Sequence, residues 1–131
     1  WDVVGFVDTN SELSNKQISG LPIYKYEDLS VSNDYYGICG IMDPQLKKRI
    51  VNNEIKPKKY NLATIVHPNI ERPSDSKIGP GSVLFPGVTF SVDVKIGNCV
   101  WVDKNSLLGH NLRVVTIHQL CPPQLLVETV K

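Results

Sequence analysis

The chain has 131 residues, with 14 basic and 13 acidic side chains and a formal net charge of +1. A charge so near zero offers no electrostatic surface for nucleic acid or for an anionic membrane, and no apolar run is long enough for a membrane span. The three cysteines lie far apart without a CxxC pair. They argue against a disulfide framework and a zinc site, so we predict no metal and a reducing cytoplasm.

Two apolar runs near the start of the chain are typical of strands. The stretch "WDVVGFVDTN" (1–10) ends its apolar part at Asp8, and "YYGICGIMD" (35–43) is expected to form a second, buried strand. Asp8 and Thr9 are candidate substrate-binding residues, because a carboxylate at a strand end commonly bonds ribose hydroxyls in nucleotide-binding α/β folds. A turn begun by Asp8 with Asn10 explains the same residues equally well.

An amphipathic helix is predicted for "PQLKKRIVNNEI" (44–55). Its expected apolar face holds Leu46, Ile50 and Ile55. Strands that alternate with helices favour a parallel α/β sheet. We therefore expect a Rossmann-like domain over residues 1–60. It should be incomplete, because its first strand and phosphate-binding turn would precede Trp1.

A six-residue period organises the second half of the chain. Large apolar residues recur at this interval with one exception, Arg72. The series is Val66, Arg72, Ile78, Leu84, Phe90, Ile96, Val102, Leu108 and Val114. The third place after each holds Gly, Asn or Asp, apart from Cys99. These places are Asn69, Asp75, Gly81, Gly87, Asp93, Cys99, Asn105 and Asn111.

The two coinciding series predict a coil of short strands. In each unit the large residue would point into a narrow core, and the Gly, Asn or Asp would take the positive φ of a sharp corner. Three units would close one triangular turn, and successive turns would stack by parallel pairing. An all-β sandwich would instead show alternation at two residues, with turns at irregular intervals.

Several motifs in this order resemble one family of enzymes. They are "GFVD" at 5–8, "GLPI" at 20–23, "ICG" at 38–40, "IVHP" at 65–68 and "VDKNSLLGHN" at 102–111. Together with the repeats they resemble the bacterial sugar O-/N-acyltransferases, which include sialic acid O-acetyltransferases and bacillosamine-pathway N-acetyltransferases. The resemblance implies a nucleotide-sugar-binding Rossmann-like domain followed, over 61–131, by a left-handed parallel β-helix.

The resemblance also implies an activity and its partners. Members of this family are cytoplasmic bacterial homotrimers that transfer an acetyl group from acetyl-CoA to a nucleotide-linked sugar or to sialic acid. Acetyl-CoA is expected along the groove between neighbouring β-helices, with Gly109 beside it. Gly40, in "ICG", corresponds to a family position near the nucleotide. The acceptor sugar and the choice between O- and N-acylation stay open.

His110 is the residue on which this activity depends. By its register it lies at a corner and should project outward, which fits a catalytic base or a surface histidine without a role. The resemblance implies the base. Direct transfer is favoured over an acyl-enzyme, because no Cys or Ser stands beside His110 in "GHN". Where the family usually has an acidic residue after the histidine, this chain has Asn111, which can orient the ring but cannot stabilise an imidazolium by charge.

Two other interpretations compete with the transferase. A γ-type carbonic anhydrase has a similar coil but holds zinc with three histidines, and the place one turn before His110 is Val92, which cannot bind metal. A hexapeptide-repeat scaffold without catalysis, or a fragment inactive on its own, would keep the coil and give His110 no role.

The regular pattern stops at about Val114, and residues 115–131 are expected to be irregular. Leu120 and Leu126 keep the six-residue register, but the corner places become Ile117, Pro123 and Thr129. Proline cannot reach positive φ, and β-branched residues resist it. We predict that this tail is the same gene read out of frame; a divergent or engineered terminus is the alternative.

The coding DNA tests the altered frame. Removing one base near codon 114 should restore Gly, Asn or Asp at the corner places and large apolar residues at the six-residue places. An early stop codon, or a frame without hexapeptides, would contradict the prediction.

Overall fold

The computed structural model describes residues 2–29, 35–115 and 119–120, and contacts divide the chain into two units, Trp1–Ser32 and Asn33–Lys131. The fold consists of many short strands in small, mostly parallel sheets, with one short α-helix. The division falls earlier than the boundary expected near residue 60. The segment that carries the α-helix groups with the strands that follow it, not with the first unit.

The first unit is a three-stranded sheet of order β1-β3-β2. Its strands are β1 (Phe6–Asp8), β2 (Gln17–Ile18) and β3 (Leu21–Lys25), with 3₁₀ turns at Ser11–Leu13 and Tyr26–Asp28. β1 pairs parallel to β3, and β2 pairs antiparallel to β3 through a tight turn at Ser19 and Gly20, both of positive φ. A 3₁₀ turn and β2, rather than an α-helix, connect the two parallel strands.

One expectation for residues 35–62 needs correction. The buried strand predicted over 35–43 is only β4 (Tyr36–Gly37), which is exposed and pairs parallel to β5 (Asn61–Leu62). Both tyrosines of "YYG" are exposed.

The helix forms where expected, and Ile50 and Ile55 of the predicted apolar face are buried. α1 (Pro44–Ile50) begins with Asp43, whose carboxylate accepts the N–H of Leu46 at 2.6 Å, and continues as a π-helical turn, Val51–Ile55. The buried side chains are Lys47, Ile50, Val51 and Ile55, whereas Leu46 is half-buried. No helix in the described residues is long and apolar enough to cross a membrane.

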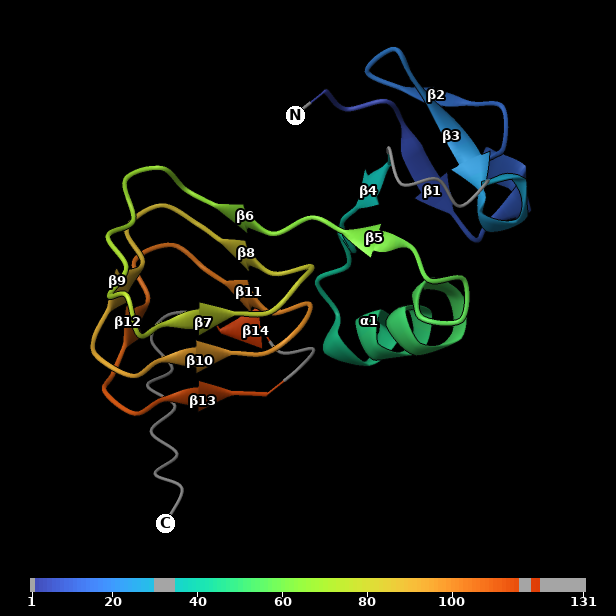
Figure 1. Ribbon diagram of the computed structural model, residues 1–131. Helices are drawn as coiled ribbons and strands as arrows, with labels where there is room; N and C mark the ends of the chain where they lie inside the picture. Colours follow the sequence, from blue (N-terminus) through green and yellow to red (C-terminus); the bar gives the residue numbers. More distant parts are fainter. Residues whose placement is uncertain (1, 30–34, 116–118, 121–131) are drawn as a thin grey trace. The chain divides into compact units, whose positions relative to one another are not determined.

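Three stacks of two-residue strands make up the rest of the second unit (Figure 1). One stack holds β6 (Ile65–Val66), β8 (Val83–Leu84), β11 (Trp101–Val102) and β14 (Gln119–Leu120). A second holds β7 (Lys77–Ile78), β10 (Lys95–Ile96) and β13 (Arg113–Val114), and a third β9 (Thr89–Phe90) and β12 (Leu107–Leu108). Every pairing is parallel, and the chain visits the stacks in rotation, returning to each after 18 residues.

The core between the stacks is built from the predicted inward places together with the mostly small or β-branched residues four positions after each of them, here called the small places. Its buried members are Leu84, Val88, Val94, Ile96, Val100, Val102, Leu108, Leu112 and Val114, against which Val66, Ile70, Ile78 and Phe90 pack. Ser82, at a small place, accepts the N–H of Val100 at 3.1 Å and donates to the carbonyl of Gly97 at 2.9 Å. Successive circuits are therefore joined by side chains as well as by strand pairing.

The corner prediction holds from Gly81 onward. Six corner places have positive φ: Gly81, Gly87, Asp93, Cys99, Asn105 and Asn111. The first two, Asn69 and Asp75, do not, and no strand forms around Arg72, the charged residue in the apolar series. A charge at an inward place would be buried without a partner. The first circuit therefore lacks the strand that would pair with β9.

Part of the expected irregular tail keeps the register. β14 pairs with β11 in the same 18-residue alignment, Val102 opposite Leu120. The corner places Ile117, Pro123 and Thr129, on which the altered reading frame was argued, lie outside the described residues.

Gly87→Ala should destabilise the protein by at least about 1–2 kcal/mol, the cost of a left-handed backbone at a residue with a Cβ. Gly87 has a φ of 79°, and a Cβ there would overlap the side-chain carbonyl of Asn105 in the next circuit. The matched control is Gly40→Ala, because a Cβ at Gly40 meets no atom within 4 Å. Urea unfolding measures both, and equal loss of stability in the two variants would contradict the prediction.

Candidate functional site

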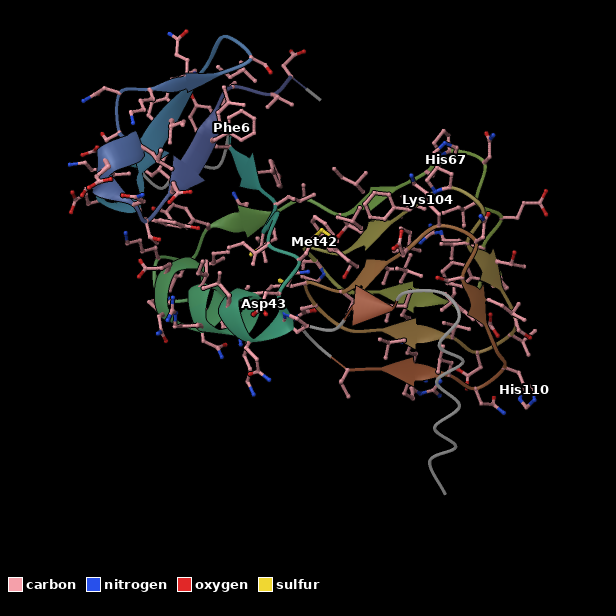
Figure 2. The ribbon with its side chains drawn as sticks, turned by 180° about the vertical axis from the view of Figure 1, so that it is seen from behind. Phe6, Met42, Asp43, His67, Lys104 and His110 are labelled. Atoms are coloured by element: carbon pink, nitrogen blue, oxygen red, sulfur yellow. The ribbon has the colours of Figure 1, made fainter. Side chains whose placement is uncertain are left out.

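The candidate site is the corner that follows β12, formed by Gly109, His110 and Asn111 (Figure 2). Asn111 has a φ of 58°, and its N–H donates to the carbonyl of Val92 one circuit earlier at 3.0 Å. This hydrogen bond holds the end of the turn at Asn111, and the side chain of His110, just before it, is exposed to solvent. The outward projection expected from the register is confirmed.

His110 and Asn111 are in contact through their side chains. Nδ2 of Asn111 lies 3.3 Å from Nδ1 of His110. With the amide in this orientation, Nδ1 accepts the hydrogen bond and the ring proton stands on Nε2. With the amide turned over, Oδ1 would accept from Nδ1–H, and Nε2 would be free to take a proton. The orientation of the Asn111 amide and the tautomer of the His110 ring are therefore linked.

Gly109 leaves open space beside the imidazole. A Cβ at Gly109 would meet no atom within 4 Å. The equivalent N–H one circuit earlier, that of Ser91, points along the stack and donates to the carbonyl of Leu108 at 2.8 Å. The residue that would accept from Gly109 in the same way, Leu126, lies outside the described residues.

A group of charges lies directly beside this corner. Asp93, one circuit before Asn111, binds Nη2 of Arg113 at 2.7 Å and the ammonium of Lys95 at 3.4 Å. The backbone N–H of Asp93 donates to the carboxylate of Asp75, one circuit earlier, at 2.9 Å. The equivalent corner places of three successive circuits therefore hold Asp75, Asp93 and Asn111. The hydrogen bond from Arg113 lowers the pKa of Asp93 below its ordinary value. These contacts fix the strand that follows His110 onto the circuit below.

The three substrate-binding candidates are divided between the two units. Asp8 ends β1, and its carboxylate accepts the N–H of Asn10 at 2.7 Å, which is the turn interpretation of these residues. Thr9 beside it is exposed. Both belong to the first unit.

Gly40 lies in the second unit, after the buried Cys39, and is exposed. The residues just beyond it, Met42 and Asp43, lie on the α1 side of the strand stacks, and His110 lies on the opposite side (Figure 2). Gly40 and His110 therefore do not form one site within this unit.

Lys47 is a buried charged group that the sequence pattern did not indicate. Lys47 is only 1% exposed, and its ammonium stands 4.4 Å from the ring centroid of Trp101. Its place one position after Leu46, in the run "KKR", gave no signal, because such runs usually form a solvated face. Across residues 2–29 and 35–115, no group of three or more His, Cys, Asp or Glu side chains could hold a metal ion.

Comparison with family models, with curated proteins and with solved structures gives no match to this chain. The resemblance to sugar acyltransferases stays an expectation drawn from the motifs and the repeat.

Asn111→Asp should raise the pKa of His110, because a carboxylate 3.3 Å from Nδ1 favours the charged imidazole. The pKa can be followed from the ring resonances by NMR as pH is varied. The matched control is Asn105→Asp. Asn105 is the corner residue just before β12 and has positive φ, but no histidine precedes it. An unchanged His110 titration in Asn111→Asp would show that the two side chains do not interact in solution.

Proposed function

We propose that this chain belongs to an acetyl-CoA-dependent sugar acetyltransferase of the bacterial sugar O-/N-acyltransferase family. Its second unit would be a left-handed parallel β-helix of hexapeptide repeats, and its first 60 residues part of a Rossmann-like domain that binds a nucleotide-linked sugar. A cytoplasmic homotrimer is part of the same proposal.

One observation carries the proposal most strongly: His110 is exposed at a corner whose geometry its neighbours fix. The hydrogen bond from Asn111 to Val92 and the amide contact to Nδ1 hold the imidazole at the surface of a coil with an 18-residue circuit. The amide beside the ring and the open space at Gly109 are compatible with a substrate bound at this corner.

The chemistry requires a base of moderate strength. An amine or hydroxyl of the acceptor attacks the thioester carbonyl and loses a proton as the C–N or C–O bond forms. Nε2 of His110 would take that proton and return it to the departing thiolate as the C–S bond breaks. For this role Asn111 has to present Oδ1 to Nδ1–H, the alternative orientation of its amide. Direct transfer fits, since the described corner offers no Cys or Ser nucleophile beside the imidazole.

Acetyl-CoA would be the co-substrate, with its thioester next to Gly109. The absence of any atom within 4 Å of a Cβ built there leaves room for an acyl carbonyl. The N–H of Gly109 could stabilise the oxyanion only if it is not used to pair with a following circuit. The exposed outer faces of β9 and β12, with Leu107 in solvent, are consistent with a neighbouring subunit that would form the other wall of the groove.

The acceptor is proposed to be a nucleotide-linked amino sugar or sialic acid. The parallel pairing of β1 with β3 and of β4 with β5, together with the carboxylate of Asp8 at a strand end, supports this acceptor. Because one oxygen of Asp8 is engaged by Asn10, only the other would be free for a ribose hydroxyl.

His110→Ala should lower kcat for acetyl transfer by roughly a hundredfold or more, the usual effect of losing a general base. The assay follows the acetylated sugar by mass spectrometry, with acetyl-CoA and a panel of nucleotide-linked amino sugars and sialic acid. The control is His67→Ala, because His67 lies one residue after an inward place and its Nδ1 accepts only the N–H of Asn69 at 3.3 Å in its own corner. An unchanged kcat in His110→Ala would remove the residue from the mechanism, and no transfer to any acceptor by the unaltered chain would favour the scaffold.

A further inference from the structure

The net charge of +1 is the sum of two unlike parts of the chain. Residues 44–60 form α1, the π-helical turn and the loop after it, and they contain six basic side chains and one acidic side chain, a net charge of +5. The rest of the chain contains 8 basic and 12 acidic side chains, a net charge of −4. A whole-chain charge near zero excludes an anionic partner only where the charge is spread evenly, and here it is concentrated in one segment.

The positive charge of this segment lies on the solvent side of the helix. On the opposite side Ile50, Val51 and Ile55 are buried. The exposed residues between 45 and 59, here called the basic face, are Gln45, Lys48, Arg49, Asn52, Asn53, Lys56, Pro57 and Lys59. Glu54, the one acid of the segment, is half-buried and lies 3.9 Å from the ammonium of Lys58. The basic face therefore contains four cations, three amides and one proline, with no acid and no large apolar side chain.

The charge of the basic face is not compensated within the helix. An acid four residues from a base stabilises a helix, but the residues four places after Lys48 and Arg49 are Asn52 and Asn53. Asparagine is neutral and is a poorer helix former than glutamate. Lys56 likewise meets an amide, since its ammonium donates to Oδ1 of Asn52 at 2.9 Å. In the described part of the chain no carboxylate forms an ion pair with a cation of this face.

The spacing of these cations matches the major groove of a DNA duplex. Lys48 and Arg49 lie at one end of the basic face and Lys56 towards the other, with the amides of Asn52 and Asn53 between them. From Lys48 to Lys56 a helix rises roughly 12 Å, and with its side chains it is about 10–12 Å across. The major groove of B-DNA is about 12 Å wide. In this arrangement the two cationic ends meet phosphates on either side of the groove, and the amides face the base edges, which asparagine can bind.

We propose that the basic face of α1 and the π-helical turn binds double-helical DNA, chiefly through its phosphates. A membrane surface fits this face less well, because a helix bound there inserts apolar side chains, and the large apolar side chains of this helix are not among the exposed ones. The helix begins just after Asp43, on the opposite side of the strand stacks from His110 (Figure 2). DNA binding at this surface is therefore separate from the corner of His110 and does not require acetyl transfer there.

The test is the affinity of the full chain for a short mixed-sequence DNA duplex that carries a fluorescent label, measured by anisotropy over a range of salt concentrations. Each phosphate that the protein neutralises contributes about −0.9 to the slope of log K against the logarithm of the salt concentration. The four cations of the basic face predict a slope of about −3 to −4. Lys48→Gln and Lys56→Gln should each bring the slope about 1 closer to zero. The matched control, Lys104→Gln, removes an exposed charge from the strand stacks and should leave the slope unchanged.

A fourth variant separates a binding surface from a face that is only solvated. Asn53→Glu places a carboxylate four residues after Arg49 and introduces a better helix former. It should raise Tm and weaken DNA binding, whereas a face without a ligand would show only the rise in Tm. Absence of a salt-dependent anisotropy change in the unaltered chain, or one slope shared by Lys48→Gln, Lys56→Gln and Lys104→Gln, would overturn the proposal. Binding to vesicles of phosphatidylglycerol without binding to the duplex would overturn it as well, because the partner would then be a lipid surface.

Discussion

Positive φ at one residue in six is the constraint on which the second unit depends. Each such corner turns the chain sharply enough for the next two-residue strand to start a new side, and three corners bring it back above its starting point. Strands this short have little stability of their own. They persist because every one pairs with the strand 18 residues away and buries one large side chain against a shared core. Where an inward place is charged, as at Arg72, the strand is lost.

The same constraint places the candidate base. At this corner His110 is directed away from the core and is exposed to solvent. Asn111 has two functions at this point, since its backbone takes the left-handed conformation and its amide meets the imidazole. An aspartate could occupy the same backbone conformation. The choice of Asn therefore affects the charge near the ring more than it affects the fold.

Charge is arranged differently on the other sides of the coil. On the stack of β7, β10 and β13 the outward residues are basic, and Asp93 pairs two of them. On the stack of β6, β8 and β11 the outward residues are apolar, and Lys47 contacts the indole of Trp101 there without an acid nearby. The two cations that pair with Asp93, Lys95 and Arg113, are half-buried, whereas Lys47 is buried and its ammonium has no hydrogen-bond partner among the described residues.

The sequence by itself determined the repeat, the inward series and most corners, because these depend on local requirements. A large apolar side chain every six residues and a residue tolerant of positive φ three places later leave few other folds open. Even Cys99, the residue that broke the corner pattern, takes a φ of 57° because its neighbours in the stack impose it. The outward position of His110 followed from the same register.

Tertiary packing decided what local patterns could not. The helical pattern indicated an apolar face of Leu46, Ile50 and Ile55, and contact with the strand stack buried Lys47 and Val51 as well, because the buried face of a helix is set by what lies opposite. The run 35–43 looked like a buried strand, yet its tyrosines are exposed. The hydrogen bond of Asp8, the contact of Asn111 with His110 and the meeting of Lys47 with Trp101 join residues by position in space, and only the folded chain defines those positions.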